Sequence, residues 1–197
     1  MNKTIVVCFL LVASLQAHSA DVTELSLIEQ RQLVRFARDV LRETVQGKTN
    51  QAVFPDTLHS QQPNAGIFVT LMKNNRVRGC YGSLYAEGAD LESQLREYAI
   101  AAATRDFRHL PVHESELDDI VIILSFIGPL EPVSGMHEVD PKREGLLIRT
   151  PVARAVLLPG EARTASWQLR EARRQAGITD SEPVELYKIH TVTIVER

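Results

Sequence analysis

Residues 66–82 read Gly-Ile-Phe-Val-Thr-Leu-Met-Lys-Asn-Asn-Arg-Val-Arg-Gly-Cys-Tyr-Gly and decide the fold of this chain. The first eight, residues 66–73, are rich in β-branched and aromatic side chains, which favours a β-strand. Asn74 and Asn75 tolerate a positive φ and therefore predict a tight turn. Residues 76–82 then return as the second strand of a hairpin, which places Arg78-Gly79-Cys80-Tyr81-Gly82 at its end.

Helices and strands alternate irregularly around this hairpin. Ser26 and Glu29 have the spacing of a capping box, and an amphipathic helix of about 20 residues follows them. Asp90 predicts the N-cap of a second helix, which is rich in alanine. Residues 120–127 are almost all apolar and predict a central strand that ends at residues 128–129, Gly-Pro.

The C-terminal third adds a second hairpin, a short helix and a long strand. Residues 145–149 and 153–158 predict the hairpin, residues 166–176 the helix, and residues 184–195 the final strand. Because strands joined by hairpins pair antiparallel, we expect an α+β fold, with a largely antiparallel sheet and flanking helices.

The first 20 residues predict a secretory signal peptide. Lys3 gives a positive n-region, residues 5–15 form an almost unbroken apolar run, and Ala17, Ser19 and Ala20 offer small side chains for cleavage. The alternatives are a buried N-terminal helix or an uncleaved anchor, but the run is shorter than the about 20 residues that cross a bilayer. We therefore expect export, to the periplasm or the medium, and one domain over residues 21–197.

Charge and cysteine content limit the classes of function. The net charge is −3 and becomes −4 when residues 1–20 are removed with Lys3, which argues against non-specific nucleic-acid binding. No second segment is long and apolar enough to cross a membrane, so we expect no membrane attachment after cleavage. Loss of Cys8 leaves Cys80 without a partner for an internal disulfide. Phosphate-binding glycine loops and paired-cysteine zinc motifs are absent, so no cofactor is expected.

Two motifs resemble the AMMECR domain family, whose prokaryotic members are also called AmmeMemoRadiSam system protein A. Residues 64–71 resemble the family's Gly-x-Phe-Val-Thr-Leu strand, and residues 77–84 resemble the Leu-Arg-Gly-Cys-Ile-Gly segment that follows it. An alanine-rich helix then leads to residues 106–109, Asp-Phe-Arg-His, where the family has Asp-Pro-Arg-Phe. The resemblance covers essentially all of residues 21–197.

The resemblance implies an α+β fold in which a larger lobe carries both termini and a smaller lobe is central. It also implies partners, namely Memo-like and radical-SAM proteins of a shared pathway, but no established activity. The chain departs from the family at Tyr81, where isoleucine or valine is usual, and at Phe107 and His109. Its predicted export differs from the cytosolic location of most members.

Cys80 has two interpretations. It is either a nucleophile or thiol ligand, with Arg78 as a nearby cation that lowers its pKa, or a small buried apolar residue. Residues i and i+2 of a strand share a face, so Arg78 and Cys80 have a spacing that permits contact. A nucleophile normally needs a base, and no histidine is adjacent to Cys80 in the sequence.

A binding cleft around the motif would use Asn64, Gly79, Gly82 and Asp106. Each also has a plainer role: Asn64 suits a turn, the two glycines permit a bulge, and Asp106 ends the alanine-rich helix among arginines that complement the helix dipole.

Two further patterns are weaker. His109, His113 and Glu116 have the spacing of metal ligands on a helix, but Pro111 between them favours a solvated loop. Trp167 and Tyr187 are expected in the core rather than in a stacking site.

Two hypotheses of function follow. In the first, the chain is a ligand- or partner-binding accessory component of a Memo/radical-SAM-associated pathway. In the second, it is an enzyme that uses Cys80 as a nucleophilic or redox-active thiol, assisted by Arg78.

Overall fold

A computed structural model describes residues 19–20, 25–48, 51–59, 62–63, 65–87 and 89–197. Most of the predicted signal peptide and Asn64 therefore lie outside the described residues. Within them, Ser19–Ala20 (β1) pairs parallel with Gln62–Pro63 (β2) as a small separate sheet.

The main sheet has six antiparallel strands in the order β4-β3-β5-β8-β6-β7. Their bounds are Ile67–Lys73 (β3), Arg76–Gly82 (β4), Ile120–Val133 (β5), Gly145–Arg149 (β6), Arg154–Leu157 (β7) and Glu185–Val195 (β8). Among the described residues, three α-helices accompany the sheet: Leu27–Val45 (α1), Leu91–Thr104 (α2) and Ala165–Ala176 (α3). The predicted α+β fold with a largely antiparallel sheet is confirmed.

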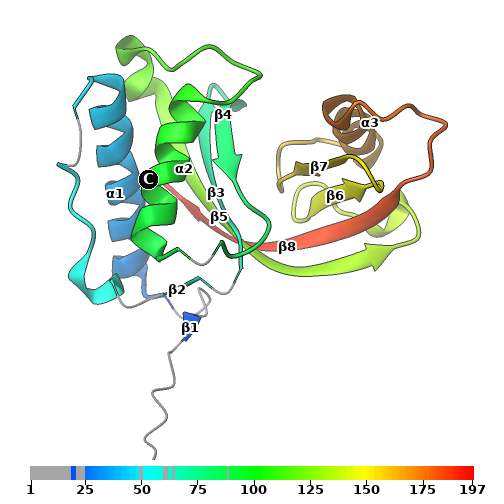
Figure 1. Ribbon diagram of the computed structural model, residues 1–197, viewed down its shortest axis with the longest axis horizontal. Helices are drawn as coiled ribbons and strands as arrows, with labels where there is room; N and C mark the ends of the chain where they lie inside the picture. The colour runs from blue at the N-terminus through cyan, green and yellow to red at the C-terminus, as the bar shows by residue number, and fades with distance from the viewer. Residues whose placement is uncertain (1–18, 21–24, 49–50, 60–61, 64, 88) are drawn as a thin grey trace, which may run out of the picture.

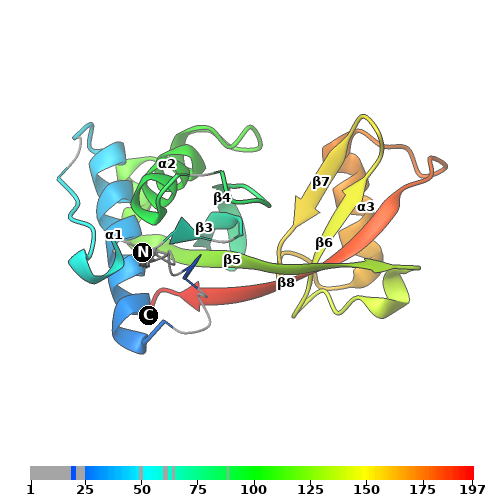
Figure 2. The same cartoon turned by 60° about the horizontal axis from the view of Figure 1, so that its bottom comes forward.

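The elements form two lobes that share the long strands β5 and β8 (Figure 1). The larger lobe contains α1, α2, β3 and β4 together with the C-terminal end of β8. The smaller lobe contains β6, β7 and α3, and comes from the middle of the chain. Figure 2 shows β5 and β8 running from one lobe into the other. A larger lobe and a smaller central lobe are thus present, as the family resemblance implied.

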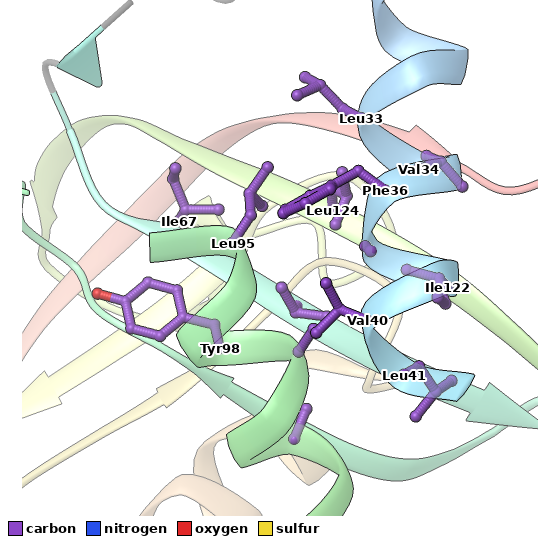
Figure 3. Close-up of a cluster of buried hydrophobic side chains, with 14 of the residues drawn as sticks. Leu33, Val34, Phe36, Val40, Leu41, Ile67, Leu95, Tyr98, Ile122 and Leu124 are labelled. Atoms are coloured by element: carbon purple, nitrogen blue, oxygen red, sulfur yellow. The ribbon is translucent and has the colours of Figure 1, made fainter. Parts of the chain in front are cut away.

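The core of the larger lobe lies between α1, α2 and one face of the sheet (Figure 3). Ser26 and Glu29 form the predicted capping box of α1, and Asp90 caps α2 by accepting a hydrogen bond from the backbone N of Ser93. The helices bury their apolar faces against strand residues that alternate toward them; the fully buried members include Leu33, Phe36, Leu41, Ile67, Leu95, Ile122 and Leu124.

The central strand is longer than its sequence predicted. The expected stop at Gly128 and Pro129 is wrong, because β5 continues to Val133. The pairing of β5 with β8 shifts register between Ile127 and Leu130, so the proline, which has no N–H to donate, falls in a bulge. This bulge allows one strand to serve both lobes.

Three 3₁₀ helices complete the described elements, at Asp56–Leu58, Glu114–Asp119 (η3) and Met136–Glu138. In the described ranges no helix has both the length and the apolar character that crossing a bilayer requires.

Candidate functional site

Strand β4 carries the Arg78–Gly82 motif at one edge of the sheet. A bulge in this strand changes which face of the sheet its successive side chains point to. Gly79 pairs with Leu71, whereas Val77 pairs with Met72, so Arg78 is an extra residue in β4. Two residues of a bulged strand oppose one residue of its neighbour, and the side chains beyond the bulge change phase. The i, i+2 spacing therefore does not place Arg78 on the same face as Cys80.

Arg78 is bound to the segment that follows α2. Its Nε and Nη2 donate to the two carboxylate oxygens of Glu116 at 2.9 and 2.8 Å, and its Nη1 donates to the carbonyl O of Leu110 at 3.0 Å. The hydrogen bonds from Arg78, with further ones from the His113 backbone and Lys73, lower the pKa of Glu116 to about 2. Arg78 thus holds the segment before β5 against the hairpin.

The Cys80 thiol is protonated at neutral pH. Its Sγ lies 3.3 Å from the hydroxyl of Thr70 on the neighbouring strand. Burial of the thiol, followed by the negative charge of Glu161, raises its pKa to about 12, although Thr70 and Arg108 act in the opposite direction. A thiol with this pKa is ionised in only about one molecule in 10⁵ at pH 7. The expected activation of Cys80 by Arg78 has no counterpart among these contacts.

Asp106 joins the motif to the loop after α2. It is 7% exposed, and its Oδ2 accepts a hydrogen bond of 2.8 Å from the backbone N of Cys80. The Arg108 side chain donates to both carboxylate oxygens, with Nε at 2.9 and 3.2 Å and Nη2 at 2.7 Å. Burial alone would raise the pKa of Asp106, but the hydrogen bonds from Arg108 and Cys80 outweigh burial and lower it.

The position of Asp106 protects an open edge. Strand β4 is the first strand of the six-stranded sheet, so its outward N–H groups have no neighbouring strand. An exposed edge of this kind can pair with another chain. The carboxylate of Asp106 satisfies the N–H of Cys80 and fixes the loop in the same contact. Asp106, predicted as a cleft residue, is therefore a link between two segments.

Gly79 and Gly82 are sites of close backbone approach. A Cβ atom on Gly79 would lie 2.1 Å from the carbonyl O of Ala102 in α2, and one on Gly82 would lie 2.2 Å from the carbonyl O of Ile67. Both distances are far below contact between non-bonded atoms. The lack of a side chain thus allows α2 and β3 to approach the motif. This packing role explains the two glycines without the binding cleft that the sequence predicted.

Glu161 is a member of the site that the sequence did not indicate. It follows β7, in the smaller lobe, and its Oε2 accepts a hydrogen bond of 3.3 Å from the backbone N of Leu158. Leu158 and Cys80 pack in the same apolar cluster, which joins the lobes. Burial raises the pKa of Glu161 to about 7, although the positive charge of Arg108 lowers it. No local pattern marks this glutamate, because its charge acts on Cys80 only once the fold has brought the two segments together.

The remaining predicted residues do not join this group. His113 accepts a hydrogen bond of 3.3 Å from the backbone N of Ser115 and begins η3, and His109 is exposed. In the described part of the chain no three His, Cys, Asp or Glu residues are grouped as metal ligands would be. The expectation for Trp167 is wrong, since its side chain is 41% exposed on α3.

A groove of ≈ 580 Å³ lies elsewhere in the larger lobe. It runs between α1 and residues 51–56, and none of its lining residues belongs to the motif. The motif region is therefore distinguished by its polar contacts and not by this groove.

Comparison with known proteins identifies the family. The AMMECR1 family pattern matches residues 34–194. The chain belongs to the AMMECR1 family. Its match covers both lobes of the fold, from α1 to the end of β8, and confirms the resemblance that residues 64–84 indicated.

Individual AMMECR1 relatives extend over much of the chain. A protein of Thermotoga maritima is 41% identical over 128 residues, which are 63% of this chain and 74% of the relative. A protein of Methanocella arvoryzae is 34% identical over 179 residues, 85% of this chain and 89% of the relative. The crystal structure of the uncharacterized protein PH0010 from Pyrococcus horikoshii matches with a TM-score of 0.66 at 26% identity, and the match covers 84% of this chain and 90% of that one. The names of these proteins state no activity.

Proposed function

We propose that this AMMECR1-family chain is a binding protein, an accessory component that acts with Memo-like and radical-SAM proteins of one pathway. The observation that carries the proposal is that the polar groups of the Arg78–Gly82 motif bind neighbouring segments of the chain. Arg78 binds Glu116, Asp106 binds the Cys80 backbone, and the Cys80 thiol is protonated beside Thr70. These groups hold a surface in shape, which is what a binding protein needs, and they leave no activated nucleophile.

The proposal predicts direct association with a pathway protein. The purified chain should bind the Memo-like or the radical-SAM protein of its own genome with a Kd in the micromolar range or tighter, measured by titration calorimetry. Purified proteins are used because the predicted export would otherwise separate the partners in the cell. Cys80→Ser should bind equally well, because the thiol contributes packing and no chemistry. Absence of binding to both proteins would refute this function.

Glu161 supplies the specific observation in favour of a thiol enzyme. A nucleophilic cysteine needs a base, and Glu161 is a carboxylate near Cys80 with a pKa of about 7. A base with this pKa is half ionised at neutral pH and can exchange a proton there. The pKa of the thiol argues against this role. It is about five units higher than that of Glu161, so the carboxylate would remove the thiol proton from only a very small fraction of molecules.

Alkylation of Cys80 by iodoacetamide distinguishes the two roles of Glu161. In a chain carrying Cys8→Ser, we expect Cys80 to react about 10²- to 10³-fold more slowly at pH 7.5 than a free cysteine, because few thiols are ionised. Glu161→Gln should speed the reaction, since the glutamate charge raises the thiol pKa. A base would give the opposite result: a rate that rises near pH 7 in the parent and is lost in Glu161→Gln.

A further inference from the structure

The sheet of the larger lobe has a second face, which points away from α1 and α2. The two helices pack on the face that carries Ile67, Ile122 and Leu124 (Figure 3). Since successive side chains of a strand point to opposite faces, Val121 and Ile123 of β5 point away from the helices. Such positions are usually polar in an antiparallel sheet with one solvated face. In β5 both positions are instead β-branched and apolar.

The strand register joins these side chains into two neighbouring rows. In the first row Met72 of β3 lies between Val77 of β4 and Val121 of β5, and in the second row Ile123 of β5 pairs with Val195 of β8. Val121 is 40% exposed and Val195 is 48% exposed, and the other three side chains are half-buried. These five residues form the open sheet face. A contiguous apolar patch of this kind marks an interaction site, whereas single exposed apolar side chains do not.

The sequence of β5 also favours cover on both faces. Residues 120–127 are almost all apolar, which is the pattern of a strand that is buried on both sides. At one end of the second face the smaller lobe supplies this cover, because Phe68 and Cys80 pack with Val156 and Leu158 in one apolar cluster. At the other end, which is the open sheet face, the described residues leave the second side of the sheet exposed.

The chemistry of the open sheet face favours an identical face as its occupant. None of its five positions is charged, and the neighbouring positions Thr70 and Thr193 carry neutral hydroxyls. Two copies of a face without charges can meet about a twofold axis without placing like charges together. A different protein would be selected by complementary charges, and an anionic bilayer by basic side chains. The open sheet face offers neither of these signals.

We propose that this chain forms a symmetric dimer in which the open sheet faces of two copies pack against each other. Antiparallel sheets pack face to face about 10 Å apart with interdigitated side chains, and this arrangement would leave α1 and α2 of each copy on the outside. Five partly exposed side chains supply less than the about 800 Å² that each partner buries in a stable complex, so we expect a Kd of about 10–100 μM. The dimer is independent of the proposed binding function.

Sedimentation velocity over a range of concentrations measures the dimer. The parent chain, purified in the form that the cell accumulates, should sediment as a monomer at about 1 μM and mainly as a dimer at about 500 μM. The dimer should persist in about 0.5 M NaCl, because salt screens ionic contacts and this face has none. A monomer at about 500 μM would overturn the proposal and leave the binding function intact, since the assay contains no other protein.

A matched pair of lysine variants locates the interface. Val195→Lys would place an ammonium group of each copy in the apolar contact and should weaken the dimer at least about 100-fold. Val152→Lys is the control, because Val152 is 90% exposed in the turn between β6 and β7, and it should dimerise like the parent. Both variants should unfold at the temperature of the parent. Equal dimerisation by the two variants would overturn the proposal.

A cross-link locates the contact without changing the apolar side chains. Thr193 is exposed at the margin of the open sheet face, and a photo-crosslinking p-benzoylphenylalanine at this position should give a covalent dimer. Mass spectrometry of the joined peptides should identify residues of β3, β5 or β8, and the same group at position 152 should give no covalent dimer. A covalent dimer joined through α1, α2 or the smaller lobe would contradict the proposed arrangement.

Discussion

Gly79→Ala is expected to destabilise the protein by about 3–5 kcal/mol, because the added methyl group would overlap backbone atoms of α2. The new Cβ would lie 2.1 Å from the carbonyl O of Ala102 and 3.2 Å from its carbonyl C. Both atoms belong to the backbone of α2, so no side chain can rotate away to make room. The helix would have to separate from β4, and the apolar contacts between them would weaken. Urea unfolding followed by circular dichroism measures this loss.

Gly47→Ala is the control for this prediction. Gly47 has a φ of +68° after α1, and nothing lies within 4 Å of the position of its Cβ. Alanine there meets backbone strain without a clash, and the expected cost is about 1 kcal/mol. If the two alanine variants lost the same stability, the close approach of α2 to Gly79 would not be the reason for glycine in the motif.

The close approach at Gly79 links the motif to the rest of the larger lobe. The alanine-rich end of α2 lies on β4 at this position, and the loop from α2 begins a few residues later, at Asp106. A helix that moved away from Gly79 would carry Asp106 with it and weaken the hydrogen bond that Asp106 accepts from the backbone N of Cys80.

The sequence predicted those parts of the fold that depend on local signals. The turn at Asn74 and Asn75 has positive φ at both residues, as the hairpin required, and the caps at Ser26 and Asp90 begin the helices at the expected places. Each of these features is determined by a few neighbouring residues. The end of β5 was missed because a bulge accommodates Pro129, and a bulge depends on the partner strand β8.

The candidate site was less accessible to prediction because its contacts join distant segments. Cys80 and Asp106 were both singled out from the motifs, but the hydrogen bond between them could not be derived from spacing. Glu161 lies in the other lobe, and its charge raises the pKa of the thiol only when both lobes have formed. The bulge at Arg78 changed the argument most, because the alternation of an ideal strand had suggested a contact with Cys80.

Arg78→Met is expected to destabilise the protein by about 2–4 kcal/mol. Glu116 is 18% exposed, and the substitution removes its two hydrogen bonds from Arg78, so that only Lys73, at 3.1 Å, remains as a cation in direct contact. The carbonyl groups of Leu110 and Pro111 lose their donor as well. Arg76→Met is the matched control, because Arg76 is exposed on the same strand, and it should change stability by less than about 0.5 kcal/mol.

The pH dependence of Arg78→Met shows whether Arg78 stabilises the fold or activates the thiol. Arg78 is the main reason why the pKa of Glu116 falls from 4.5 to about 2, so its stabilisation is complete above pH 4.5 and is lost as the pH falls toward 2. The difference in stability between parent and variant should therefore narrow over this range. Alkylation of Cys80 should keep its pH profile in Arg78→Met, since the charges that act on the thiol are those of Glu161, Arg108 and Asp106. A profile displaced to higher pH, with stability unchanged, would instead make Arg78 the activating cation of a reactive cysteine.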